Sequence, residues 1–101
     1  MPDIRFEWNE DNRLKNLAER NIDFCDAIKV FHSPYDLRPA RSDTEERYLA
    51  VGPLGDLIVE VVYVRREEAY RILDARPARP NYASKFREKF SGREHLFDNP
   101  H

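Results

Sequence analysis

The stretch YLAVGPLGDLIVEVVYVRREEAYRILDAR (Tyr48–Arg76) decides the fold. It holds three runs rich in Val, Ile and Tyr, separated by the turn signals GPLGD and Glu67-Glu68. Runs of this composition, bounded by Gly, Pro, Asp or charge clusters, are typical of neighbouring strands. The middle run, LIVEVVYVRR, is apolar almost throughout, and Glu60 is its one interruption. We therefore predict hairpin-linked antiparallel strands, with the middle run central and both of its faces at least partly covered.

The residues before this stretch predict one strand and then a helix. IRFEW (Ile4–Trp8) alternates apolar and charged side chains, which indicates a half-buried strand. Asn9 is suited to cap a helix that ends near Arg20, with Asn21 in the left-handed position that follows many helices. The apolar stripe expected on this helix consists of Leu14, Leu17 and Ala18.

A second helix is predicted to begin after Asp23, which would cap it. Pro34 ends this helix, because proline disfavours the helical conformation for the residue before it. Tyr35–Ala40 is then compatible with a short edge strand, since Pro39 fits a sheet only at an edge or a bulge. The apolar stripe of the second helix, at helical spacing, is Phe24, Ala27, Ile28 and Phe31.

After the strands, the run PARPNY indicates a turn, and Tyr82–Phe90 is predicted to form the last helix. Residues 91–101 are expected to form a loose C-terminal tail, and residues 1–90 a single domain. The predicted order is strand, helix, helix, three or four strands, helix. This order predicts an α+β fold with helices packed on a mostly antiparallel sheet.

Length and composition exclude several classes of protein. A chain of 101 residues, 41% hydrophobic and 36% charged, fits one globular domain. No run approaches the roughly 20 apolar residues of a membrane span, and the N-terminus has no apolar signal segment. The lone Cys25 can form no intrachain disulfide, which suits a cytoplasmic location. Three scattered histidines and one cysteine do not form a ligand cluster, so we expect no metal site and no cofactor.

Charge is distributed unevenly along the chain. The net charge is −2, which gives no general attraction to nucleic acid. Residues 65–93, however, contain nine Lys or Arg residues against four Asp or Glu residues. Because this third of the chain is basic, the net charge does not exclude a basic face that binds RNA.

The segments FEWNEDNRLKNL, IDFCDAIKVF, EERYLAVG and the pair VVYVRR and YRILDAR follow one another with a distinctive order and spacing. Together, over residues 4–80, they resemble the BrnT family of bacterial type II toxins. The resemblance implies a RelE-like fold and a metal-independent ribonuclease that cleaves RNA and inhibits translation. It also implies a cognate BrnA-like antitoxin that holds the toxin inactive, with DNA contacted only through that antitoxin.

The chain departs from the family pattern at three places. Glu19–Asn21 replaces the usual Lys-His-Gly, Asp74–Arg76 replaces Ser-x-Arg, and Pro80–Ala83 replaces a basic run. Each change removes positive charge or a polar group near the expected RNA surface. An alternative function is therefore a catalytically weakened relative that acts as the binding partner of an antitoxin or repressor complex. A small-molecule enzyme has little support, since no Gly-rich loop or nucleophile motif occurs.

The expected chemistry assigns roles to particular residues. Cleaving RNA without a metal requires a base for the 2′-hydroxyl and positive groups for the phosphorane charge. Arginine suits the second task, because its guanidinium stays charged and grips phosphate with two donors. Matched to the family pattern, the catalytic candidates are Arg47, Arg71, Arg76 and, as the base, Glu46. The candidates for RNA binding are Tyr63, Arg65 and Arg79.

Each candidate also has a purely structural interpretation. Arg71 and Arg76 can pair with nearby carboxylates on a solvated face. Glu46 and Arg47 can belong to a charged loop, where a surface ion pair contributes only about 0–1 kcal/mol. For Tyr63, packing in the core or across strands is the more common role of such a residue.

Overall fold

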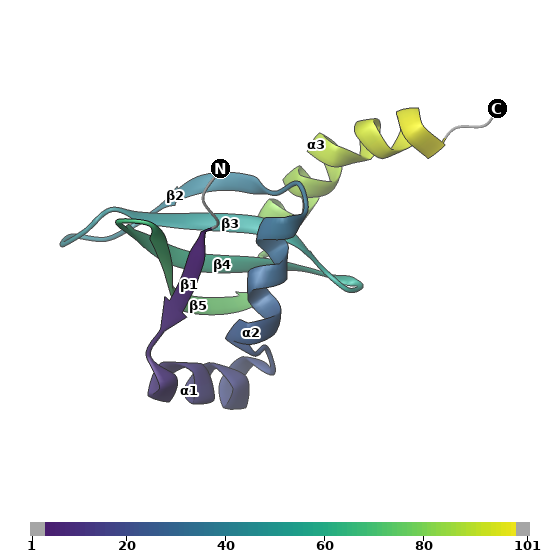
Figure 1. The fold of residues 1–101 in the computed structure, drawn as a ribbon. Helices are drawn as coiled ribbons and strands as arrows, with labels where there is room; N and C mark the ends of the chain where they lie inside the picture. Colours follow the sequence, from purple (N-terminus) through teal and green to yellow (C-terminus); the bar gives the residue numbers. More distant parts are fainter. Residues whose placement is uncertain (1–3, 99–101) are drawn as a thin grey trace.

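The chain forms strands and helices in the order that the sequence predicts (Figure 1). The structure, a computed structural model, describes residues 4–98 and the side chains of residues 4–90. The elements are β1 (Arg5–Trp8), α1 (Glu10–Arg20), α2 (Phe24–Ala27), the 3-10 helix η1 (Ile28–His32), β2 (Asp36–Ala40), β3 (Arg47–Leu54), β4 (Leu57–Arg66), β5 (Ala69–Pro77) and α3 (Pro80–Asp98).

All five strands belong to one sheet, in the order β1-β5-β4-β3-β2. The pairs β2–β3, β3–β4 and β4–β5 are antiparallel, and β1 adds to β5 in parallel. The apolar run LIVEVVYVRR is thus the central strand, as predicted, and β2 is an edge strand that accommodates Pro39. The prediction of an α+β fold with a mostly antiparallel sheet is confirmed.

Two tight turns connect the three central strands. Gly55 and Asp56 join β3 to β4, and Gly55 takes the left-handed conformation (φ 60°) that glycine adopts readily. Because β3 continues to Leu54, this turn is shorter than predicted. Glu67 (φ 52°) and Glu68 join β4 to β5, where the sequence predicts the second turn.

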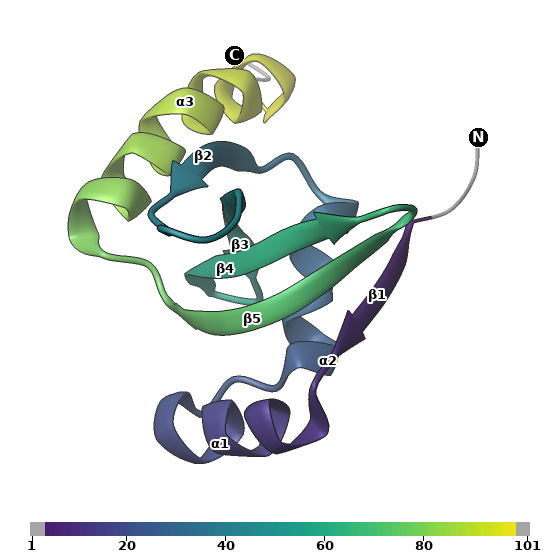
Figure 2. The ribbon, with the colours of Figure 1, turned by 90° about the vertical axis from the view of Figure 1, so that its left-hand side faces the viewer.

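Helices cover the two faces of the sheet differently (Figure 2). On one face, α2 and η1 pack over the main core. On the opposite face, α3 packs on β3, and its Phe86 joins Leu49 and Val51 in a smaller core. Figure 2 shows α3 beside β2 and β3 and away from β5. The fully buried side chains of the main core include Phe24, Val30, Val59, Val61, Tyr63 and Ile72.

The first helix packs on the free edge of β5 through asparagine side chains. Because β1 pairs only with Ala69–Ile72, the backbone groups farther along β5 need other partners. The Asn16 amide nitrogen donates to the Ala75 carbonyl at 2.9 Å, and its amide oxygen accepts from the Ala75 N–H at 3.2 Å. Asn12 donates to the Leu73 carbonyl at 2.9 Å. Side chains of α1 thus continue the hydrogen bonding that β1 begins.

This arrangement contradicts the apolar stripe predicted for the first helix. Leu14 is 50% exposed and Ala18 is also exposed, whereas Asn16 is only 6% exposed. The predicted helix ends are correct. The Asn9 side chain accepts from the Asn12 N–H at 3.0 Å, and Asn21 has φ 59° after the last turn.

The second helical segment begins as predicted and then tightens. The Asp23 side chain accepts from the Cys25 N–H at 2.9 Å and caps α2. From Ile28 the chain forms a 3-10 helix, and Val30 is buried against the sheet. A Cβ atom on Gly52 would lie 2.8 Å from Val30 Cγ1, so the absence of a side chain lets η1 approach β3.

The C-terminal helix is longer than the sequence predicts. It runs from Pro80 to Asp98 rather than from Tyr82 to Phe90, and so includes most of the segment expected as a loose tail. Pro80 suits the first helical turn, because the backbone N–H that proline lacks would have no acceptor within the helix at that position. The rest of the expected tail, residues 99–101, lies outside the described residues.

Candidate functional site

The second face of the sheet carries a groove lined by arginines. The groove has a volume of about 630 Å³ and lies between the strands and the start of α3. Four guanidinium groups and one carboxylate make its lining positive, which suits a polyanion. We call it the arginine groove. Its lining consists of the polar residues Arg41, Arg47, Asp74, Arg76, Arg79 and Tyr82 and the apolar residues Pro39, Ala40, Leu49, Val62 and Leu73.

Strand register brings these side chains to one surface. Successive side chains of a strand point to opposite faces, and residues paired across strands share a face. Leu49, Val62 and Asp74 are paired across β3, β4 and β5 and form one row of the groove. The next row consists of Val51, Glu60 and Arg76.

A β-bulge in β5 decides which of its side chains face the groove. The register shifts between Val62 and Tyr63 of β4, which leaves Leu73 of β5 without a partner. The extra residue moves the alternation of β5 by one position. As a result Asp74 and Arg76 face the groove, although strict alternation from the start of β5 would turn them toward the core.

Glu60 lies beneath two arginines of the groove. Its side chain is fully buried, with 0% exposed. Its Oε1 accepts from Arg76 Nε at 3.2 Å and from Arg79 Nη2 at 3.0 Å. Its Oε2 accepts from Arg79 Nε at 3.0 Å and from the Arg79 backbone N–H at 2.7 Å. Burial acts to raise the pKa of Glu60, but the hydrogen bonds from both arginines outweigh it and lower the pKa below its ordinary value.

Arg47 and Arg71 lie on the same face as this pair. Arg47 lines the groove, and its Nε donates to Glu45 at 3.3 Å. Arg71 lies farther along the face, where its Nη1 donates to Glu7 of β1 at 3.0 Å, and it does not line the groove. Both ion pairs are partly exposed, and surface ion pairs of this kind contribute little to stability.

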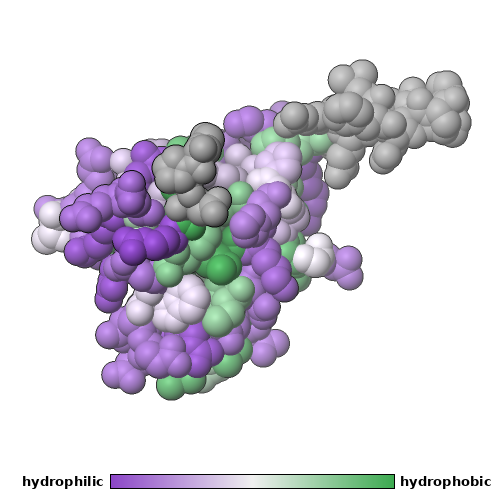
Figure 3. Space-filling view, in the orientation of Figure 1, coloured by the Kyte–Doolittle hydropathy of each residue, from purple (hydrophilic) through white to green (hydrophobic). Residues whose placement is uncertain are grey.

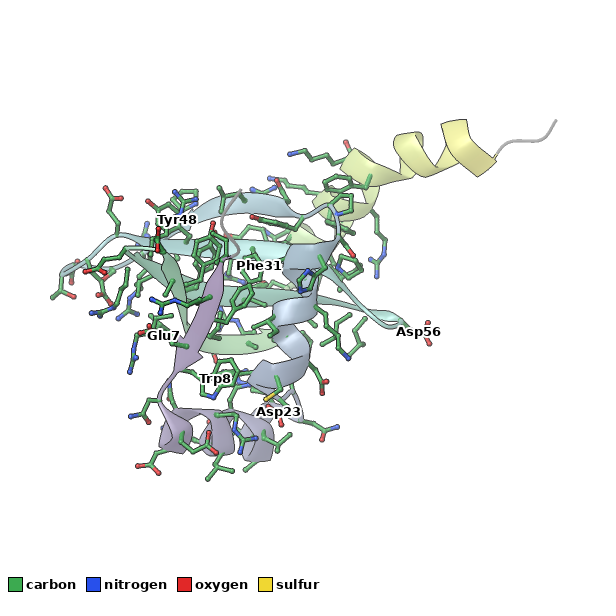
Figure 4. The ribbon with its side chains drawn as sticks, viewed as in Figure 1. Glu7, Trp8, Asp23, Phe31, Tyr48 and Asp56 are labelled. Atoms are coloured by element: carbon green, nitrogen blue, oxygen red, sulfur yellow. The ribbon has the colours of Figure 1, made fainter. Side chains whose placement is uncertain are left out.

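Glu46 and Arg65 belong to a different cluster, around Tyr48, which Figure 4 labels. The Tyr48 hydroxyl donates to Glu46 at 2.8 Å, and the Arg65 guanidinium lies 4.2 Å from the centre of the Tyr48 ring. Tyr48 packs against the main core, on the face opposite the groove. The structure therefore does not bring Glu46 to the groove arginines as their base, and it separates Arg65 from the other predicted arginines.

Tyr63 is part of the main core. Its side chain is 0% exposed, and its ring stacks on Tyr70 with the ring centroids 4.6 Å apart. Phe31 of η1, labelled in Figure 4, lies edge-on to Tyr63 at 5.1 Å. Burial raises the pKa of Tyr63 to about 12. A ring that solvent does not reach cannot stack on an RNA base, so the packing interpretation of Tyr63 fits this structure.

The two faces of the sheet thus differ in chemistry. Figure 3 shows the face of β1 and α2, where apolar side chains reach the surface between these elements. The partly buried aromatic residues Phe6, Phe31 and Tyr35 belong to this face. The arginine groove lies on the other face and carries four of the guanidinium groups of the described residues.

Three polar residues of the groove, Arg41, Asp74 and Tyr82, are not predicted as site residues from the sequence. Arg41 follows β2, and Tyr82 lies in the first turn of α3, where the Arg79 guanidinium lies 4.4 Å from the centre of its ring. Asp74 is visible in the sequence only as a departure from the family pattern. Glu60 has a clearer signal, because it is the one charge inside an apolar strand.

The described part of the chain also bears on metal binding and on membrane spanning. No group of three or more His, Cys, Asp or Glu side chains there is placed to hold a metal ion. No helix within residues 4–98 combines the length and the apolar character that crossing a membrane requires. Cys25 is exposed on α2 rather than packed in the core.

Comparisons with known proteins identify the family and a similar fold. A family model described as the ribonuclease toxin BrnT of a type II toxin–antitoxin system matches residues 8–81. The structure is similar to the crystal structure of the Brucella abortus ribonuclease toxin, BrnT, with a TM-score of 0.63 and 28% sequence identity. That match covers 76% of this chain and 99% of the Brucella chain. A comparison with curated protein sequences gives no match.

Proposed function

Since the chain belongs to the BrnT family of ribonuclease toxins of type II toxin–antitoxin systems, we propose that it cleaves RNA at the arginine groove without a metal ion. Cleavage of RNA in the cytoplasm would inhibit translation. The observation that carries this proposal is the convergence of Arg47, Arg76 and Arg79, from separate segments, on one positive groove. Guanidinium groups in such a groove bind phosphodiesters through charge-assisted hydrogen bonds.

The proposed reaction is attack of a 2′-hydroxyl oxygen on the adjacent phosphorus. The new bond closes a 2′,3′-cyclic phosphate, and the bond to the 5′ oxygen breaks and leaves a 5′-hydroxyl, which takes a proton from water. Asp74 is the carboxylate that lines the groove, so it is the proposed acceptor of the 2′-hydroxyl proton. Arg47 and Arg76 stabilise the charge of the phosphorane. Arg79 and Arg71 bind the RNA on either side of the reacting phosphate.

The proposed partner is a cognate BrnA-like antitoxin. An acidic or extended segment of the antitoxin would cover the arginine groove and pair its carboxylates with Arg47 and Arg76. RNA and antitoxin would then compete for one surface. Contact with DNA would occur only through the antitoxin.

Expression in a bacterial host tests this function. The wild-type chain should arrest growth and translation, co-expression of the antitoxin should restore both, and an Arg47→Ala/Arg76→Ala variant should be harmless while still folding. Arg20→Ala is the matched control, because Arg20 is exposed at the end of α1 and, contrary to the expectation from the family pattern, does not line the groove. Arrest by the double variant as strong as by the wild type would contradict a role for the groove.

A second candidate function is antitoxin binding without ribonuclease activity. It is favoured by the carboxylates in and below the groove, since Asp74 repels phosphate and Glu60 neutralises part of the charge of Arg76 and Arg79. Under this alternative, the purified chain would bind the antitoxin tightly and cleave no RNA. Growth would then continue normally when the chain is expressed alone.

A further inference from the structure

Glu60 occupies a position where a charge is costly. It lies at the centre of β4, between Val59 and Val61, and its side chain is fully buried. Removing a carboxylate from water requires compensating partners, and apolar residues of similar size often stabilise such a site better than an ion pair does. Stability alone is therefore a weak reason for a glutamate at this position. The hydrogen-bond partners of Glu60 indicate a different reason.

The contacts of Glu60 hold two guanidinium groups in defined positions. Arg79 is fixed by three hydrogen bonds, from Nε at 3.0 Å, Nη2 at 3.0 Å and the backbone N–H at 2.7 Å. Arg76 is held through Nε, at 3.2 Å. No side chain within residues 4–90 forms a hydrogen bond with either terminal nitrogen of Arg76, and its side chain is 30% exposed at the groove.

A guanidinium held through Nε presents its two terminal nitrogens as a pair. Such a pair matches two oxygens of one phosphate group. Without an anchor, a long arginine side chain would lose conformational freedom whenever it bound an anion. An arginine that is already fixed loses less conformational freedom when it binds the anion.

We propose that Glu60 is a positioning residue that fixes Arg76 and Arg79 so that the terminal nitrogens of Arg76 face a phosphodiester in the arginine groove. This inference rests on the proposed function, since it assigns the phosphodiester to RNA. Glu60 does not touch the RNA. It acts through the two arginines, and it neutralises only one of their two charges.

The sign of one mutational effect tests the inference. Glu60→Gln removes a negative charge below the groove, and by charge alone it should tighten the binding of RNA. Positioning predicts the opposite, because the amide holds two guanidinium groups less well than the carboxylate. We expect about tenfold weaker binding of a single-stranded 2′-O-methyl RNA, which cannot be cleaved, in fluorescence anisotropy. Glu10→Gln, at an exposed ion pair on α1, should leave binding unchanged.

A double-mutant cycle separates positioning from a general loss of structure. In an Arg76→Ala/Arg79→Ala background, Glu60→Gln should change RNA affinity by less than about twofold, because the residues that it positions are gone. The inference would be overturned if Glu60→Gln lowered RNA affinity equally in both backgrounds. It would also be overturned if Glu60→Gln left the affinity of the otherwise wild-type chain unchanged or raised it. If the wild type binds no RNA and cleaves none, the proposed function itself fails, and the inference fails with it.

A measurement on the wild type needs no folded variant. The Nε–H protons of Arg76 and Arg79 should exchange with water more slowly than that of the exposed Arg20, as seen in nitrogen–proton NMR spectra. Exchange at the same rate for all three arginines would contradict an anchor at Glu60, whatever the fate of the Glu60→Gln variant.

Discussion

Asp74 and Arg76, which have one residue between them, lie on the groove side of β5 and carry opposite charges. In a site that must bind phosphate, a carboxylate weakens binding unless it takes part in the reaction. As the proposed base, Asp74 would lie next to the charge that develops on the phosphate, where it could accept the proton of the 2′-hydroxyl. Glu46 instead accepts a hydrogen bond from Tyr48 on the other face.

These two carboxylates give a paired prediction at the residue scale. Asp74→Asn should lower kcat for RNA cleavage about a hundredfold, with little loss of RNA affinity, because a general base acts mainly in the transition state. Glu46→Gln should leave kcat within about twofold. Steady-state cleavage of a fluorogenic RNA measures both variants. The reverse pattern would return the role of base to Glu46.

Glu60 gives a prediction on pH at the same scale. Its pKa is lower in the folded chain than in the unfolded chain, so its ion pairs stabilise the fold above the unfolded pKa of about 4.3, and this stability is lost as the pH falls through the folded value. The difference in unfolding free energy between wild type and Glu60→Gln should therefore be constant from pH 7 to pH 5 and shrink toward pH 3. Urea unfolding at these pH values measures it. A difference that grows on acidification would be inconsistent with a lowered pKa.

The roles of single residues could be predicted only in part from the sequence. Arg47, Arg76 and Arg79 do line one groove, and the family resemblance is what indicated them, because strict alternation along β5 would turn Arg76 toward the core. Tyr63 and Glu46 do not line the groove. The sequence does not reveal which face of the sheet a side chain takes when a bulge or a loop interrupts the alternation.

At the scale of the element, α1 replaces a missing strand neighbour. Asn16 satisfies both backbone groups of Ala75 and also donates to the Ile22 carbonyl at 2.8 Å. Asn16→Ala would leave these buried groups without partners, and it should lower the unfolding free energy by about 1–3 kcal/mol. Leu14→Ala, at an exposed position of the same helix, should cost less than about 0.5 kcal/mol. Chemical denaturation compares them, and an equal or larger cost for Leu14→Ala would show that α1 packs through its apolar residues.

Element ends were easier to predict than element contacts. The caps at Asn9, Asn21 and Asp23 are local, so the residue type alone indicates them. The side of α1 that packs on the sheet was not predictable, because it depends on where β1 stops pairing with β5. The residues involved are far apart in the chain, since Asn16 and Ala75 are separated by 59 positions. The bulge in β5 is likewise set by pairing with β4 rather than by its own composition.

At the scale of the whole molecule, the sheet separates the main core from the arginine groove, the proposed site. The face under α2 and η1 holds the main core, and the face beside α3 holds the arginine groove. The fold class and the order of elements follow from hydrophobic patterning, which is why they could be predicted. The position of the groove depends on the assembled sheet, to which β2, β3, β4, β5 and the start of α3 all contribute.

The antitoxin proposal also belongs to this scale. If an acidic segment occupies the groove, RNA and antitoxin exclude one another, and Arg47→Ala/Arg76→Ala should weaken both interactions by about tenfold or more. Isothermal titration with the purified antitoxin, with and without the 2′-O-methyl RNA, measures this competition. Antitoxin that binds the RNA-saturated chain with undiminished affinity would place its contact elsewhere.

The most direct test of the account is cleavage of single-stranded RNA by the purified chain. We predict that the wild type produces 2′,3′-cyclic phosphate ends at the same rate with and without EDTA. The Arg47→Ala/Arg76→Ala variant should be slower by about a hundredfold or more, and Arg20→Ala should match the wild type. Thermal unfolding of all three proteins confirms that they are folded. Undiminished cleavage by the double variant, or loss of wild-type cleavage in EDTA, would contradict a metal-independent ribonuclease site in the arginine groove.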